Sequence, residues 1–178
     1  MVGLICKVAG SLCVLAAAGA FGESKALSLE LRVRQLQQFQ RSLKLLSAEI
    51  TFSRALLPYA FQAIALQVEA EPPLGELYRH AAAALLAGDE RSAGEIWESA
   101  VAHIFPRSAF TPADREVLSS LSVSLGVSEQ EGQLKQIGLT LQHLEIALEA
   151  AREQRRRNKK MWRYLSLAGG AALVILLL

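Results

Sequence analysis

Two long series of apolar residues, spaced mostly three and four positions apart, place the strongest constraint on the fold. The first series starts at Leu29 and continues with Leu36, Phe39, Leu43, Leu46, Ile50 and Leu57. The second series consists of Leu134, Ile137, Leu141, Leu144, Leu148 and Ala151. Residues with this spacing share one face of an α-helix, so two long amphipathic helices are predicted. Because polar Arg32 and Ser53 interrupt the first series, burial within a helical bundle is favoured over a dimeric coiled coil.

All five prolines of the chain lie at predicted helix boundaries. Pro58 suits the first turn of a second helix, and Pro72 and Pro73 end that helix because proline cannot continue it. A third helix is predicted over residues 74–87 and ends at Gly88. These boundaries define two short helices after the first long one.

Three further helices are predicted from capping residues at their starts. The capping residues are Asp89 for the fourth helix, Thr111 with Pro112 and Asp114 for the fifth, and Ser128 with Glu131 for the sixth. Pro106 follows the fourth helix, and Gly126 is predicted to end the fifth. With aromatic residues at 6% and few β-branched runs, the sequence predicts an all-α protein of about six helices. The first and last helices are expected to pack together as an antiparallel stalk.

Both ends of the chain are apolar over lengths that approach the thickness of a bilayer. A helix of about 20 residues spans the hydrocarbon layer, so transmembrane helices are predicted at residues 1–22 and 161–178. They flank a domain of residues 23–160 and are continuous with its first and last helices. A cleaved signal peptide is the alternative for the first segment. The second segment is short, so its full crossing stays open.

Positive charge gathers just before the C-terminal segment. Seven of the 19 Lys and Arg residues lie between Arg152 and Arg163, whereas residues 23–151 contain 11 basic and 16 acidic residues, a net charge of −5. Basic segments stay in the cytoplasm, which predicts a two-pass membrane protein with its middle domain cytoplasmic. The predicted membrane-interface residues are Arg155, Arg156, Arg157, Lys159, Lys160, Trp162, Arg163 and Tyr164. The adjoining aromatic residues favour lipid headgroups over RNA as the ligand of this tract.

The middle domain lacks the residue clusters that catalysis requires. It contains two Asp, three His and no Cys, and the sequence has no glycine-rich phosphate-binding loop. His80, His103 and His143 fall on different predicted helices without the spacing of metal ligands. Glu76 shares a helix face with His80, but two ligands do not make a zinc site. The sequence therefore predicts a protein without enzymatic activity, cofactor, metal or nucleic-acid partner.

Several short motifs occur in a fixed order along the chain. They are Arg34-Gln35-Leu36, Leu46-x-x-Glu49-Ile50 with Leu57-Pro58, Trp97, Leu125-Gly126 followed by Gln133, and Tyr164-Leu165 with Gly169-Gly170. Together with the chain length and the two apolar ends, this order resembles the stage III sporulation protein AB family. The resemblance covers essentially the whole chain, and its support comes from the order of the motifs.

The resemblance implies a mother-cell membrane protein whose helical bundle is similar to the platform proteins of type II secretion and type IV pilus machines. Such a protein is expected to act as an adaptor between a membrane channel and a cytoplasmic ATPase similar to sporulation protein AA. The partner-binding candidates are Glu49, Arg34 and Gln133. Glu49 has three alternative roles: an ion pair with the last helix, a contact with the ATPase, or an ordinary solvated charge. The other functional hypothesis is a lipid-binding or membrane-shaping protein in which the bundle is a spacer.

Overall fold

The computed structural model describes the backbone of residues 2–53, 56–68, 72–126 and 129–177. Side chains are described for residues 24, 26–52, 56–68, 72–126, 129–158 and 161. The chain divides into two compact units, one of residues 32–150 and one of residues 1–31 with 151–178. The described residues form six α-helices and no strand, which confirms the all-α prediction.

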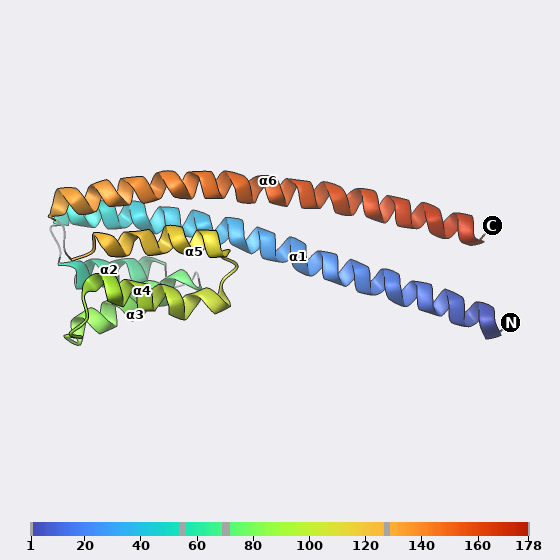
Figure 1. Cartoon of the computed structure of the whole chain (residues 1–178), viewed down its shortest axis with the longest axis horizontal. Coiled ribbons are helices and arrows are strands. Elements are labelled where there is room, and N and C mark those ends of the chain that lie inside the picture. The colour runs from blue at the N-terminus through green and yellow to red at the C-terminus, as the bar shows by residue number, and fades with distance from the viewer. Residues whose placement is uncertain (1, 54–55, 69–71, 127–128, 178) are drawn as a thin grey trace. The chain divides into compact units, whose positions relative to one another are not determined.

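The two long helices that the apolar series predict are α1, Val2–Ala48, and α6, Gln130–Leu177. Within the unit of residues 32–150 they lie side by side and run in opposite directions (Figure 1). The side chain of Gln130 joins α6 to the segment that follows α1, because its Nε2 donates to the carbonyl oxygen of Ile50 at 2.9 Å. In the other unit, Arg155 Nη1 donates to Glu30 Oε1 at 2.8 Å.

The first long helix does not extend to Leu57, contrary to the prediction. After α1 the chain forms a π-helical segment, η1, at Glu49–Ser53, and Leu57 is the first residue of α2. Pro58 occupies the first turn of α2, where its missing N–H has no helical partner to lose. A helix that continued through Pro58 would lose a backbone hydrogen bond and clash with the preceding turn, so the chain must break before it.

Four short helices and two 3₁₀ segments connect the long helices. They are α2 Leu57–Gln67, α3 Leu74–Leu86, α4 Ala93–Ile104, η2 Phe105–Arg107, α5 Pro112–Ser119 and η3 Ser120–Val123. Gly88 follows α3 with φ of 73°, a left-handed conformation that suits glycine. Gly126, with φ of 78°, does not end α5, because η3 comes between them.

The predicted capping residues are confirmed for α5 and wrong for α4. Thr111 and Asp114 form the predicted capping box of α5. The cap of α4 is Ser92, whose hydroxyl accepts from the Glu95 backbone N–H at 3.2 Å, and not Asp89. Asp89 instead accepts from the backbone N–H and the guanidinium of Arg91, and these local bonds occupy its carboxylate. Ser128, the predicted cap of α6, lies outside the described residues.

The core of residues 32–150 centres on four aromatic side chains from four helices. Phe39, Phe61, Tyr78 and Trp97 are fully buried, and the Trp97 ring centroid lies 5.5–6.3 Å from the other three. Trp97 Nε1 donates to the carbonyl oxygen of Leu118 at 2.8 Å, so the polar atom of this ring is satisfied. The predicted apolar series of α1 therefore provides the central face of the bundle.

Among the residues that the structure describes, no helix combines the length and the apolar character needed to cross a bilayer. The predicted transmembrane segments at 1–22 and 161–178 belong to α1 and α6 by their backbone, residues 1 and 178 excepted. Apart from Met161, their side chains lie outside the described residues. The two membrane spans therefore remain a prediction from the sequence.

Candidate functional site

The side chains of Arg32 and Asp114 form a buried ion pair between α1 and the start of α5. Arg32 Nε lies 2.7 Å from Asp114 Oδ2, and Nη2 donates to Oδ1 at 3.0 Å. Asp114 also accepts from the backbone N–H and the hydroxyl of Thr111. Burial raises the pKa of Asp114, but the hydrogen bonds from Arg32 and Thr111 outweigh it and leave the pKa below its usual value. This pair explains why an arginine interrupts the first apolar series.

A second polar cluster joins α3 to α4 at the surface. His103 Nε2 lies 3.0 Å from Glu76 Oε1, and Arg107 Nη2 donates to the same oxygen at 2.9 Å. The hydrogen bond with His103, together with the Arg107 charge, lowers the pKa of Glu76. The His80 ring stacks on the His103 ring at 5.0 Å. Sequence reasoning placed these histidines on separate helices and missed that α3 and α4 bring them together.

Neither cluster is arranged as a metal site. Across the side chains that the structure describes, no group of three or more His, Cys, Asp or Glu residues is arranged to hold a metal ion. Asp114 is fully engaged by Arg32 and Thr111. Glu76 is engaged by His103 and Arg107. Both clusters therefore act as links between helices.

The three predicted partner-binding residues do not form one site. Glu49 is half-buried at the start of η1, and among the described residues no Lys or Arg lies within ion-pair distance of it. Gln133 is half-buried in the first turn of α6. It lies at the same end of the bundle as Glu49, as shown by the hydrogen bond from Gln130, in the same turn, to the Ile50 carbonyl oxygen. Arg34 is exposed on α1, about 22 Å along the helix from Glu49 at 1.5 Å per residue.

Of the eight predicted membrane-interface residues, three have described side chains. Arg155 pairs with Glu30, while Arg156 Nε lies 4.0 Å from Glu153 and its side chain is 73% exposed. Arg157 is also exposed. The side chains of Lys159, Lys160, Trp162, Arg163 and Tyr164 lie outside the described residues.

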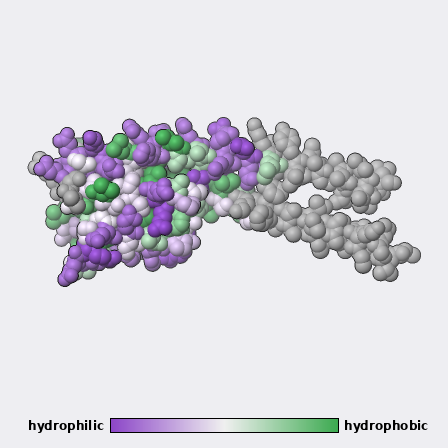
Figure 2. All heavy atoms as spheres, viewed as in Figure 1, coloured by the Kyte–Doolittle hydropathy of each residue, from purple (hydrophilic) through white to green (hydrophobic). Residues whose placement is uncertain are grey.

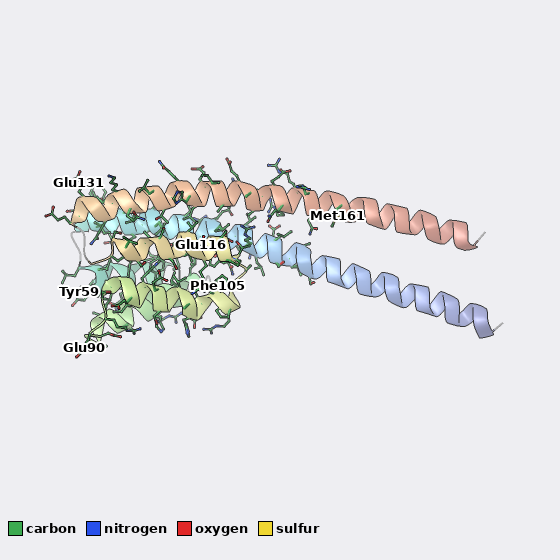
Figure 3. All side chains as sticks on the ribbon, in the orientation of Figure 1. Tyr59, Glu90, Phe105, Glu116, Glu131 and Met161 are labelled. Carbon is green, nitrogen blue, oxygen red and sulfur yellow. The ribbon has the colours of Figure 1, made fainter. Side chains whose placement is uncertain are left out.

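The end of the bundle that carries Glu49 exposes large apolar side chains, which we call the tip surface. Its apolar members are Phe52, Leu56 and Tyr59, which are 85%, 70% and 56% exposed. Its acidic members are Glu49, Glu129 and Glu131. Tyr59 and Glu131 both lie at this end of the unit (Figure 3). Over the visible face of this unit, hydrophilic side chains alternate with side chains of intermediate hydropathy and with hydrophobic ones (Figure 2).

Sequence reasoning missed the apolar members of the tip surface, although a signal was present. Phe52 and Leu56 do not fall on the three-and-four spacing that places Leu46 and Ile50 in the core. Large apolar residues that are off the buried face and next to a helix-breaking proline are expected to be exposed. A cluster of exposed large apolar residues is typical of an interaction surface in a folded protein.

These features define an all-helical bundle with exposed large apolar side chains and, among its described side chains, no group arranged to hold a metal ion. The chain belongs to the stage III sporulation protein AB family, because the model of that family matches residues 7–178. It is 29% identical over 172 residues to the stage III sporulation protein AB of Bacillus subtilis (strain 168), covering 97% of this chain and 99% of that protein. A solved structure of stage III sporulation protein AB superposes with a TM-score of 0.66 at 29% identity, covering 71% of this chain and 98% of the solved chain.

Proposed function

We propose that this chain is a non-enzymatic adaptor of a sporulation-specific, secretion-like membrane complex, in which it docks a cytoplasmic ATPase similar to sporulation protein AA. Membership of the stage III sporulation protein AB family supports the role in sporulation. The observation that carries the adaptor role is the tip surface, where Phe52, Leu56 and Tyr59 remain exposed beside a tightly buried core. Exposed apolar residues of this size are stabilised by contact with a partner.

The proposal includes a membrane topology in which residues 1–22 and 161–178 span the membrane of the mother cell and residues 23–160 face its cytoplasm. Its support is the apolar composition of both segments and the basic tract before the second. The chain should then resist extraction from membranes by alkaline carbonate, and protease added to inverted vesicles should digest the middle domain. Digestion from the opposite side alone would exclude this topology.

The adaptor role is tested by a direct binding measurement. The full-length chain, immobilised in detergent or nanodiscs, should retain the AA-like ATPase of the same host. A chain with a cooperative thermal unfolding transition that retains no ATPase would contradict the adaptor role. An ATPase outside the sporulation system serves as the specificity control.

Lipid binding by the basic tract is the second candidate function. It is favoured by the exposure of Arg156 and Arg157 on α6, which leaves two positive charges open to solvent. Anionic lipid headgroups attract such charges by about 1 kcal/mol each. In this reading the bundle is a spacer and the tip surface has no ATPase partner.

A further inference from the structure

We propose that the tip surface binds a partner segment whose apolar side chains are flanked by Lys or Arg. The segment would cover Phe52, Leu56 and Tyr59 with its apolar residues and face Glu49, Glu129 and Glu131 with its basic ones. This inference rests on the proposed adaptor function, and it names the surface and the chemistry through which the ATPase would be held.

The apolar part of the tip surface is dense for a solvent-exposed region. Three large side chains within eight positions, Phe52, Leu56 and Tyr59, are each more than half exposed. Leu66, seven positions after Tyr59 on α2 and therefore on the same helix face, is also 70% exposed. Aromatic side chains with this exposure are typical anchors of protein interfaces, since they bury a large area with few rotatable bonds.

Hydrogen bonds fix the described backbone of the tip surface in η1 and at the start of α2. Thr51 Oγ1 donates to the Ser47 carbonyl oxygen at 2.7 Å, and Gln130 Nε2 donates to the Ile50 carbonyl oxygen at 2.9 Å. These bonds hold η1 on both sides, and π-helical turns of this kind are often found at functional sites. The Leu56 carbonyl oxygen accepts from the backbone N–H of Tyr59 at 3.0 Å, which fixes the start of α2. These fixed parts of the tip surface lose little conformational entropy on binding.

The charges around this apolar surface are mainly negative. Segments 49–59 and 129–135 contain three acidic residues and two basic ones, the exposed Lys135 and Arg54, which lies outside the described residues, so the acids outnumber the described basic residue three to one. Among the described side chains, none of the three acids has an ion-pair partner. An apolar centre with an acidic rim complements a segment with an apolar centre and a basic rim, and it repels an acidic one.

The exposed side chains of α1 carry positive charge, and this difference from the tip surface helps to distinguish a basic partner from an acidic one. Arg34, Arg41 and Lys44 are exposed along α1, and residues 31–48 contain no acid. An acidic partner would therefore be directed to α1, and a basic, apolar partner to the tip surface.

The test uses the full-length chain and the AA-like ATPase of the same host, with affinity measured as Kd at two salt concentrations. Phe52→Ser with Tyr59→Ser should raise Kd at least tenfold at both, because two anchors are removed. Glu49→Lys with Glu131→Lys should raise it at least tenfold, more at low salt than at high salt. Matched controls on α6, Ile146→Ser and Glu145→Lys, should leave Kd within about twofold, since Glu145 lies about 21 Å along α6 from Glu131.

The partner chemistry is read by crosslinking. Tyr59 is replaced by p-benzoylphenylalanine, the complex is irradiated, and the crosslinked ATPase peptide is identified by mass spectrometry. The peptide should contain apolar residues flanked by Lys or Arg, and an acidic peptide would overturn the inference.

Each remaining outcome is decisive. Tip variants that are folded and bind the ATPase as tightly as the unchanged chain would overturn this inference and leave the adaptor role intact. If the unchanged chain fails to bind the ATPase, the adaptor role fails and this inference fails with it. The chain could also associate with itself or bind phosphatidylcholine vesicles. If the Phe52 and Tyr59 substitutions abolish either interaction but leave ATPase binding unchanged, another occupant covers the tip surface, and the inference is overturned.

Discussion

The guanidinium group of Arg32 meets the carboxylate of Asp114 at two points, although the residues are separated by 82 positions in the sequence. Their side chains are 9% and 1% exposed. The same carboxylate caps the first turn of α5 through Thr111. One buried acid therefore fixes the conformation of a helix start and the position of that start against α1.

Replacing Asp114 by Asn should leave Arg32 buried without a counter-ion. Because an unpaired buried charge is far less stable than a paired one, Asp114→Asn is expected to lower the free energy of unfolding by about 3–5 kcal/mol. Urea denaturation of the full-length chain followed by circular dichroism measures the change. The double variant Arg32→Met with Asp114→Asn should lose less than the sum of the two single variants. Additive losses would show that the two side chains do not interact.

The lowered pKa of Asp114 also predicts how stability depends on pH. Since the folded pKa lies below the unfolded value, about 3.9, the stabilising contribution is present above that pH. It is lost as the pH falls from about 4 through the folded pKa. The free energy of unfolding should therefore fall more steeply below pH 4 in the unchanged chain than in Asp114→Asn. Parallel curves for the two proteins would contradict this assignment.

Gly94 and Gly138 form a matched pair of helical glycines with opposite expectations. A Cβ atom at Gly94 would overlap the backbone carbonyl of Ser122, which cannot rotate away, whereas a Cβ atom at Gly138 would meet nothing within 4 Å. Gly94→Ala is expected to destabilise the fold by about 1–3 kcal/mol. Gly138→Ala should stabilise it by about 1 kcal/mol, since alanine favours the helix. Thermal unfolding distinguishes the two, and equal shifts for both variants would show that α4 and η3 are not in close contact.

Tyr78 should resist ionisation in the folded protein. Burial raises its pKa well above the usual value, and the hydrogen bond with Ser42, 2.9 Å between the hydroxyl oxygens, opposes this only in part. Folding stability that depends on the neutral phenol is present below about pH 10 and is lost as the pH rises further. In an alkaline titration followed by absorbance near 295 nm, the unchanged chain should show a tyrosine ionisation at high pH that coincides with unfolding. This ionisation should be absent in Tyr78→Phe. That variant should also be less stable by about 1 kcal/mol at neutral pH.

The lipid-binding alternative predicts a salt-dependent interaction with membranes. A fragment of residues 23–160 should bind vesicles that contain phosphatidylserine, and replacing Arg155, Arg156 and Arg157 by Ser should weaken binding about 100-fold at low salt. A fragment of this extent is reasonable, because a relative has been solved as a chain that covers 71% of this one. Binding that does not change with ionic strength would exclude the basic tract as the cause. Vesicles of neutral lipid are the control.

Periodicity predicted the fold where burial is one-sided and continuous. The first apolar series is buried from Leu36 on α1 to Ile50 on η1, because a helix face covered along its length leaves a regular pattern in the sequence. Short-range chemistry was harder to predict, because several polar residues can cap the same turn. Asp89 and Ser92 both have oxygen acceptors, and only the three-residue spacing from Ser92 to Glu95 allows the reciprocal bonds of a capping box.

The members of the tip surface could not be predicted from the spacing of apolar residues alone. Glu49 was predicted from its place beside the apolar series, but the exposure of Phe52 and Tyr59 follows from the π-helical turn and the path of the chain into α2. The pairing of Arg32 with Asp114 is likewise a contact between distant segments. Such contacts are set by the packing of whole helices, which one local pattern does not specify.

The bond between Gln130 and the Ile50 carbonyl joins residues 80 positions apart, and this has a consequence for synthesis on the ribosome. At roughly 5–20 residues per second, α6 begins to emerge about 4–16 s after η1. The bundle cannot be completed during that interval. A nascent chain halted between these two points would lack the Gln130 side chain that binds the Ile50 carbonyl, and it would be a ready substrate for chaperones until translation resumed.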